Sequence, residues 1–159
     1  QVTSIPTANG EITDLEMGSN SLYRYTMPLG VASLTDTITG SRENGTVFFT
    51  PTVNIILNRL TKEDQNEIKL LAQTKLVIFA ELNATLASNG HTVIVCLGRV
   101  NGMELNAGTM DSGAAFGDRG GYTLTFDGLE TEPFIMVKDY TATPFDNADS
   151  SNPIPIISA

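Results

Sequence analysis

Residues 52–82 constrain the fold more than any other part of the chain, because they place one amphipathic helix between two strongly apolar segments. Residues 52–58 alternate, which predicts a strand with one apolar face, and residues 75–82 are almost continuously apolar, which predicts a central strand covered on both faces. Thr61 is a good N-cap residue, and the acidic residues after it complement the helix dipole. We therefore expect one helix near residues 61–74, lying on a sheet.

The segment before this unit has the pattern of a β-hairpin. Residues 34–39 and 46–50 predict two strands, and the loop between them ends in an Asn-Gly pair that supplies the positive φ such turns require. Adjacent residues of a strand point to opposite faces, so Phe48 and Phe49 need cover on both sides. Unless this strand lies between two layers, part of the cover must come from outside the domain's own core.

The second half of the chain carries further strand patterns. Residues 91–99 alternate most regularly, and residues 103–105 follow an Asn-Gly turn as their predicted hairpin partner. Residues 106–121 are rich in glycine and small side chains, which predicts a long irregular loop. Residues 134–137 add a last strand. The strand that follows the loop is expected to point three residues inward: Tyr122, Leu124 and Phe126.

These patterns predict a mainly β (α+β) fold, a β-sandwich or small barrel flanked by one α-helix. The 159 residues suffice for one domain with a core that needs no disulfide or metal. We place that domain at residues 22–137, between an extended N-terminal arm of residues 1–21 and an extended, proline-containing tail of residues 138–159. The apolar anchors of the arm are Ile12, Leu15 and Met17.

The charge balance is strongly acidic, with 18 Asp and Glu against 9 Lys and Arg and a formal net charge of -9. The cations are scattered, without the cluster that phosphate binding needs, so we do not expect nucleic-acid recognition. A pore through which DNA slides without sticking would favour this sign of charge. No apolar run reaches the roughly 20 residues of a membrane-spanning helix. We expect no secretory signal, although an upstream piece could have been lost before Gln1.

We found no convincing catalytic, metal or cofactor site in the sequence, and therefore expect a protein that is not an enzyme and needs no cofactor. His91 and Cys96 are the only histidine and the only cysteine. Their odd separation along one strand places them on opposite faces, which argues against a nucleophilic pair. We expect Cys96 to be a small buried core residue and His91 to lie at a strand start.

Acidic residues gather in two turns, and paired carboxylates could serve a glycosidase or hold Ca²⁺. The chain has no tryptophan to stack on a sugar and no DxDxDG calcium loop, so solvated acidic turns are favoured. A small hydrolase that uses Asp127 and Glu132 is a third hypothesis. Calcium binding stays open for Asp111, Asp118 and Asp127. The turn after residue 126 contains Asp127, Glu130 and Glu132.

The predicted order of elements is a hairpin, a strand, one helix, a return strand, a second hairpin and a terminal GYTLTFDGLETEPFIMV. This order resembles that of the tail tube proteins of tailed phages and of the related tube and ring subunits of contractile injection systems. The segment GDRGGYTLTFDGLETEP is also similar to small virion proteins of phages that infect gut Bacteroidetes. The resemblance covers residues 34–137.

This resemblance implies a β-sandwich flanked by a helix, hexameric rings whose sheets join into a continuous β-lined channel, and no catalysis. Residues 34–50 would be the contact arm between rings. The implied role is a virion structural subunit, assembled in the host cytoplasm, with copies of itself and other virion proteins as partners. DNA would be only non-specific passing cargo. Tube subunits need no tail like residues 138–159, so a head-tail connector, ring or capsid-decorating role stays open.

The mechanism we expect is exchange of strands and arms between identical chains, because a closed ring gives every unpaired strand edge a partner. The candidate interface residues come from the hairpin, the glycine-rich loop and the tail: Arg42, Glu43, Phe48, Phe49, Phe116, Arg119 and Phe145. The alternative is a carbohydrate- or surface-binding β-sandwich module, which would need an exposed aromatic platform. The available rings are Tyr23, Tyr25, Tyr122 and Tyr140.

Overall fold

The computed structural model describes residues 4–17, 20–28, 30–58, 61–85, 90–115, 117–138, 140 and 156–158. In these residues the chain is mainly β with one helix, which confirms the predicted fold class. The chain forms two compact units, each built from segments that are far apart in sequence. The first unit takes Gln1–Thr26, Val77–Arg99 and Phe134–Ala159, and the second takes Met27–Leu76 and Val100–Pro133. The choice between sandwich and barrel concerns how sheets pack on one another and stays a prediction.

The first unit contains a five-stranded sheet in the order β1-β2-β10-β7-β6. Its strands are β1 (Thr7–Ala8), β2 (Glu11–Ile12), β6 (Ile78–Thr85), β7 (Thr92–Leu97) and β10 (Ile135–Val137). β7 lies inside the sheet and is covered on both faces, since the residues of its second half are all buried. The central position predicted for residues 75–82 is wrong, because β6 is the edge strand of the described sheet. The residues of β6 are half-buried or exposed, so the continuous apolar run predicted the strand but not cover on both of its faces.

The start of the first unit is a tight β-hairpin. Asn9 and Gly10 have φ values of 54° and 81° and join β1 to β2, as in a two-residue hairpin turn with left-handed central residues. β2 then pairs in parallel with β10, and the three anchors of the predicted arm, Ile12, Leu15 and Met17, are buried. The sequence signal for this hairpin, Asn-Gly between two short segments, was present but was assigned to an arm.

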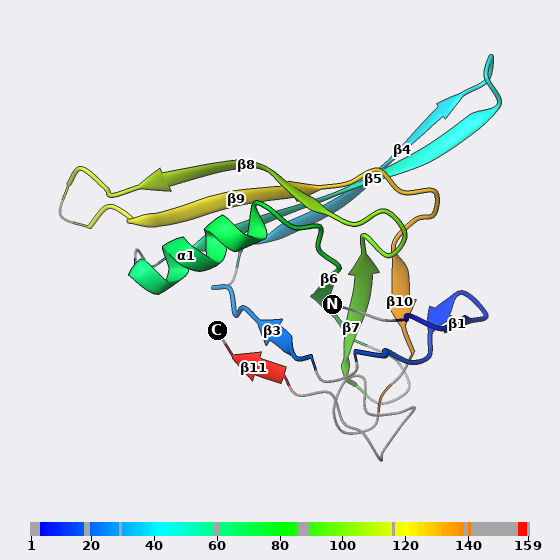
Figure 1. The fold of residues 1–159 in the computed structure, drawn as a ribbon, viewed down its shortest axis with the longest axis horizontal. Coiled ribbons are helices and arrows are strands. Elements are labelled where there is room, and N and C mark those ends of the chain that lie inside the picture. The colour runs from blue at the N-terminus through cyan, green and yellow to red at the C-terminus, as the bar shows by residue number, and fades with distance from the viewer. Residues whose placement is uncertain are drawn as a thin grey trace. The chain divides into compact units, whose positions relative to one another are not determined.

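The second unit contains a four-stranded antiparallel sheet in the order β4-β5-β9-β8. Its strands are β4 (Ser33–Ser41), β5 (Thr46–Leu57), β8 (Glu104–Asp111) and β9 (Gly121–Asp127). The tips of the β4–β5 and β8–β9 hairpins point in opposite directions along the sheet (Figure 1). On β9, Tyr122, Leu124 and Phe126 are 7%, 2% and 3% exposed, which confirms their predicted inward face.

Two sequence expectations are wrong in this sheet. Residues 106–121 are not one irregular loop, because Asn106 to Asp111 belong to β8, and β8 pairs with β9 rather than with β7. Pairing with a strong neighbour made a strand from residues of low strand propensity. The strands predicted for residues 46–50 and 52–58 are one strand, β5, and Pro51 lies inside it. It stands where β9 has just ended, so its missing N–H removes no bond of the β5–β9 ladder, which starts at Thr52.

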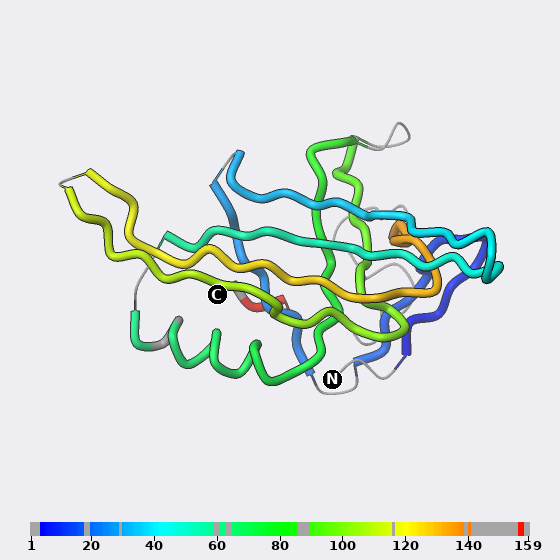
Figure 2. Tube along the Cα trace, turned by 90° about the horizontal axis from the view of Figure 1, so that it is seen from above, coloured from blue at the N-terminus to red at the C-terminus, as the bar shows by residue number. Residues whose placement is uncertain are grey.

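The single helix, α1 (Lys62–Leu71), lies along β8 and β9 in both ribbon views (Figures 1 and 2). The carbonyl of Thr61 accepts a hydrogen bond from the Gln65 N–H at 3.1 Å, which agrees with Thr61 as the N-cap residue. The helix is shorter than the predicted residues 61–74. After it, Leu76 and Met103 exchange two backbone hydrogen bonds of 2.8 Å. This bridge ties the segment after the helix to the start of β8.

Candidate assembly surface

The outer sides of β4 and β8 have no strand partner in the described part of the chain. Phe49 on β5 exchanges backbone hydrogen bonds of 2.9 and 2.8 Å with Glu130, on the side away from β4. Since successive residues of a strand direct their N–H and C=O groups to opposite sides, Ile38, the β4 residue opposite Phe49, directs its own backbone groups to the free edge. By the same alternation, Leu57 on β5 and Tyr122 on β9 direct their backbone N–H and C=O groups toward each other. Tyr122 therefore directs none toward Met110, its opposite residue on β8, and the backbone groups of Met110 point to the free edge of β8.

These two edges lack the features that commonly prevent strands from pairing with another chain. Neither β4 nor β8 contains lysine, arginine or proline. β4 is 9 residues long and β8 is 8 residues long, so neither edge is short. β8 shifts register between Leu105 and Ala107, but its pairing is regular from there to Asp111. These features favour pairing with another strand at both edges, and of the two edges only β8 has the helix α1 beside it (Figures 1 and 2).

The distal part of the β4–β5 hairpin exposes apolar side chains. The β5–β9 ladder begins at Thr52, so residues 46–50 pair with β4 and otherwise only through the Phe49–Glu130 bridge. Ile38 and Val47 on one face are 68% and 59% exposed, and Phe48 on the other face is 40% exposed. Exposed apolar residues gathered on both faces of one hairpin favour an interaction surface.

One face of the second unit's sheet is made mainly of threonine, and no strand residue on it is a cation. The register places the side chains of Ser33, Asn54 and Thr125 on this face, where Thr125 donates to Asn54 at 2.7 Å and Asn54 donates to Ser33 at 3.3 Å. None of the four strands contains lysine or arginine. Four carboxylates lie on these strands: Asp36, Glu104, Asp111 and Asp127. By the register, Glu104, Asp111 and Asp127 share the threonine-rich face and Asp36 lies on the other one. Two cations reach this face from outside the strands, Arg119 at the Thr123 hydroxyl and Lys75, which pairs with Glu104 at 3.4 Å. A polyanion would therefore find mainly hydroxyl groups and carboxylates here.

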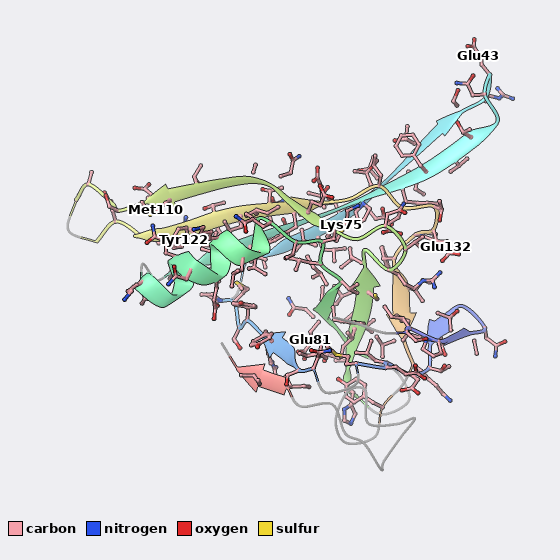
Figure 3. All side chains as sticks on the ribbon, viewed as in Figure 1. Glu43, Lys75, Glu81, Met110, Tyr122 and Glu132 are labelled. Atoms are coloured by element: carbon pink, nitrogen blue, oxygen red, sulfur yellow. The ribbon has the colours of Figure 1, made fainter. Side chains whose placement is uncertain are left out.

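The predicted interface residues lie at the two ends of this sheet where the structure describes them. Arg42 and Glu43 are exposed in the turn of the β4–β5 hairpin, and Figure 3 shows Glu43 at its tip. Phe48 is exposed, and Phe49 is half-buried at the hairpin's base. Arg119, at the opposite end, donates to the hydroxyl of Thr123 at 3.0 Å. Phe116 and Phe145 lie outside the described residues.

The structure assigns Glu130 a role that the sequence did not predict. Its side chain is 5% exposed and accepts hydrogen bonds from three successive backbone N–H groups, those of Val100, Asn101 and Gly102, at 3.1, 2.9 and 3.2 Å. The expectation of a solvated acidic turn is therefore wrong for this residue. Because the Glu130 backbone also pairs with Phe49, one residue fixes both this turn and the base of the exposed hairpin.

Asp111 and Asp118 shape the loop at the end of the β8–β9 hairpin. Asp118 accepts hydrogen bonds from the backbone N–H groups of Ala115 and Ala114 at 2.6 and 3.0 Å, and these bonds hold the pKa of its carboxyl below the ordinary value. Asp111 accepts from the Gly113 N–H at 2.9 Å. These are turn-forming contacts. Throughout the described residues, no group of three or more His, Cys, Asp or Glu side chains is placed to hold a metal ion.

The other residues singled out in the sequence have packing or hydrogen-bonding roles. Cys96 is buried, as predicted, and forms no disulfide. His91 lies edge-on to the ring of Tyr140, with the two ring centres 4.8 Å apart. Asp127 accepts a hydrogen bond from the side chain of Asn106 at 2.8 Å. Glu132 is exposed near the end of β9 (Figure 3).

The aromatic platform required by the carbohydrate-binding alternative is not formed by the four tyrosines together. Tyr122 and Tyr140 are 7% and 6% exposed, whereas Tyr23 is 63% exposed and Tyr25 is half-buried.

Among the described residues, the one helix is too short and too polar to cross a bilayer. Comparisons of this chain with protein families, with curated protein sequences and with solved structures found no match.

Proposed function

We propose that this chain is a non-enzymatic structural subunit of a phage virion, a tail tube or ring protein that assembles with copies of itself around a DNA-conducting channel. The observation that carries the proposal is the pair of unblocked sheet edges, β4 and β8, at opposite sides of one antiparallel sheet. If β4 of one copy pairs with β8 of the next, each copy adds four strands to a continuous sheet. A closed ring of such copies leaves no edge of this four-stranded sheet unpaired.

The threonine-rich face of the sheet supports the channel part of the proposal. A closed sheet has one face toward its lumen, and lysine or arginine on that face would hold DNA through its phosphates. The four strands carry no such residue, and their charged side chains are all carboxylates. We therefore place this face toward the lumen. The exposed β4–β5 hairpin, with Ile38, Val47 and Phe48, would then contact the adjacent ring, as the resemblance to tail tube proteins implies.

The test is the assembly state of the purified chain as a function of its concentration. Size-exclusion chromatography with light scattering should show rings or larger assemblies, and negative-stain electron micrographs should show annular or tubular particles with a central channel. The assembled protein should not retard duplex DNA in a gel at low salt, where non-specific binding is strongest. A chain that stays monomeric at every concentration, or that binds DNA tightly, would contradict the proposal.

A further inference from the structure

The two-stranded sheet of the first unit brings together segments from the two ends of the chain. β3 (Leu22–Arg24) and β11 (Ile156–Ser158) run parallel, with Ile157 opposite Tyr23. Figure 1 shows β11, in red, beside β3. Within the described part of the chain, each of these strands is the other's sheet partner and has no second one. The pairing therefore depends on three residue pairs alone.

The surroundings give this pairing little support. Tyr23, Ile156 and Ile157 are 63%, 40% and 45% exposed, so the apolar side chains of the two strands are only partly buried. A ribbon of two strands is marginal in water, and parallel pairing is slightly less stable per residue than antiparallel pairing. Any copy of β11 could form the same ladder of backbone hydrogen bonds with β3. Nothing in the contacts of β11 requires that it come from the same chain.

The acceptor strand and the start of the C-terminal tail are both fixed to the five-stranded sheet by one chain of polar contacts. Arg24 on β3 forms an ion pair of 3.3 Å with Glu81 on β6, and Glu81 accepts a hydrogen bond from the Thr92 hydroxyl at 2.6 Å. That hydroxyl is 3.2 Å from the hydroxyl of Tyr140, whose side chain is 6% exposed. Tyr140 is thus held at the five-stranded sheet, and the next described residue of the tail is Ile156, the first residue of β11.

The length of the intervening segment permits delivery of β11 to another copy. Residues 141–155 separate Tyr140 from Ile156. Fifteen residues span at most about 50 Å when fully extended, which exceeds the distance between neighbouring small domains in contact. A tether of this length gives the strand an effective concentration of millimolar order at any acceptor in reach, its own or a neighbour's. At micromolar concentration, β11 of an unassembled chain therefore pairs with β3 of the same chain. In an assembly, β3 of a neighbouring copy is a second possible partner for β11.

We propose that β3 is the acceptor for β11 of a second copy of this chain, so that neighbouring subunits exchange their C-terminal strands. This inference rests on the proposed self-assembly. The occupant is β11 itself, because the structure already shows these residues in register on β3. Exchange forms no new kind of contact, but it connects each subunit to the next through the segment anchored at Tyr140.

The test mixes two variants, each of which carries one new cysteine at this pair. Tyr23→Cys in one preparation and Ile157→Cys in another face each other across the ladder, at a separation that a disulfide can bridge. The two are mixed at assembly concentration and oxidised, and products are separated without reductant. Only β11 of one copy lying on β3 of another can join the two chains at these positions. Leu129→Cys, at an exposed site that belongs to the second unit, replaces Tyr23→Cys in the control mixture.

The expected result is a covalent dimer of the two different chains, formed at least about tenfold faster than in the control mixture, because only the ladder holds its cysteines within bonding distance. The double variant in one chain should give a covalent ladder of higher oligomers at assembly concentration and a closed monomer on dilution. No mixed dimer, with a closed monomer from the double variant at every concentration, overturns the exchange. Light scattering of the same samples reports separately whether the chain assembles, so failure of the exchange is distinguishable from failure of the proposed function.

Discussion

β7 and the distal part of the β4–β5 hairpin are both apolar strand segments, yet they have opposite surroundings. Val95 and Leu97 of β7 are 0% and 1% exposed, whereas Ile38 and Val47 of the hairpin are 68% and 59% exposed. Burial contributes roughly 25 cal/mol per Å² of apolar surface, so β7 stabilises the fold and the hairpin gains very little from its apolar side chains. Apolar alternation thus identifies a strand but does not tell whether other residues of the chain bury its apolar side chains. The exposed side chains of this hairpin are the ones that the proposed assembly would bury.

The largest expected effect separates these two regions directly. Leu97→Ala should lower the free energy of unfolding by about 3 kcal/mol, because it leaves a cavity among buried neighbours. Ile38→Ala should change it by less than about 0.5 kcal/mol, because the side chain is in water. Urea unfolding followed by far-UV circular dichroism, at concentrations where the chain is monomeric, measures both. Equal losses of unfolding free energy for the two variants would show that the hairpin is packed within the single chain, which would contradict the exposure of Ile38.

The second effect concerns the residue that fixes the base of the hairpin. Glu130→Ala should cost about 2 kcal/mol of unfolding free energy, since it leaves three backbone N–H groups of residues 100–102 without their acceptor. Glu130→Gln keeps one oxygen acceptor, so its free energy of unfolding should lie between those of Glu130→Ala and the parent. Glu132→Ala, at an exposed carboxylate two residues away, is the matched control and should be near neutral. If Glu132→Ala lowered the free energy of unfolding as much as Glu130→Ala does, the loss could not be assigned to the hydrogen bonds of Glu130.

Much of the local structure follows from the sequence, because it is set by nearest neighbours. The helix start at Thr61, the inward face of β9 and the burial of Cys96 were all predictable from side-chain spacing and capping chemistry. The positive φ of Gly45 in the β4–β5 turn, 62°, agrees with the predicted Asn-Gly loop. In each case the residues that decide the outcome lie within a few positions of one another.

The features that the sequence did not give depend on contacts between distant residues. β8 is a strand because β9 pairs with it, and its run of small residues carries no sign of this. The parallel pairing of β2 with β10 joins residues 11–12 to residues 136–137, and no local pattern encodes it. Glu130 lies in a turn that resembles a solvated one until its three amide partners are known. The free edges that support the assembly surface became visible only with the sheet order.

The smallest effect tests the loop at the other tip of the sheet, where Asp118 makes polar contacts. Hydrogen bonds from the Ala115 and Ala114 N–H groups lower the pKa of Asp118 in the folded chain. A carboxyl with a lowered folded pKa adds stability above its unfolded pKa and loses it as the pH falls through the folded value. Asp118→Asn should therefore be slightly less stable than the parent near neutral pH, and the difference should vanish in acid.

The Asp118 carboxyl can be followed directly by carbon-13 NMR during a pH titration. A midpoint below the ordinary aspartate value agrees with the contacts described. A midpoint at the ordinary aspartate value would mean that the loop contacts are not formed in solution.

The most direct test of the account is the oligomeric state of an edge-blocked variant, measured by light scattering across a range of concentrations. Ile38→Pro removes an N–H that points to the free edge of β4 and leaves the β4–β5 hydrogen bonds in place, while Ile38→Ala shortens the same side chain and keeps that N–H. The account predicts that Ile38→Pro keeps the parent's circular dichroism but remains monomeric where the parent and Ile38→Ala assemble. Assembly of a folded Ile38→Pro variant equal to that of the parent would contradict the claim that copies join through this edge.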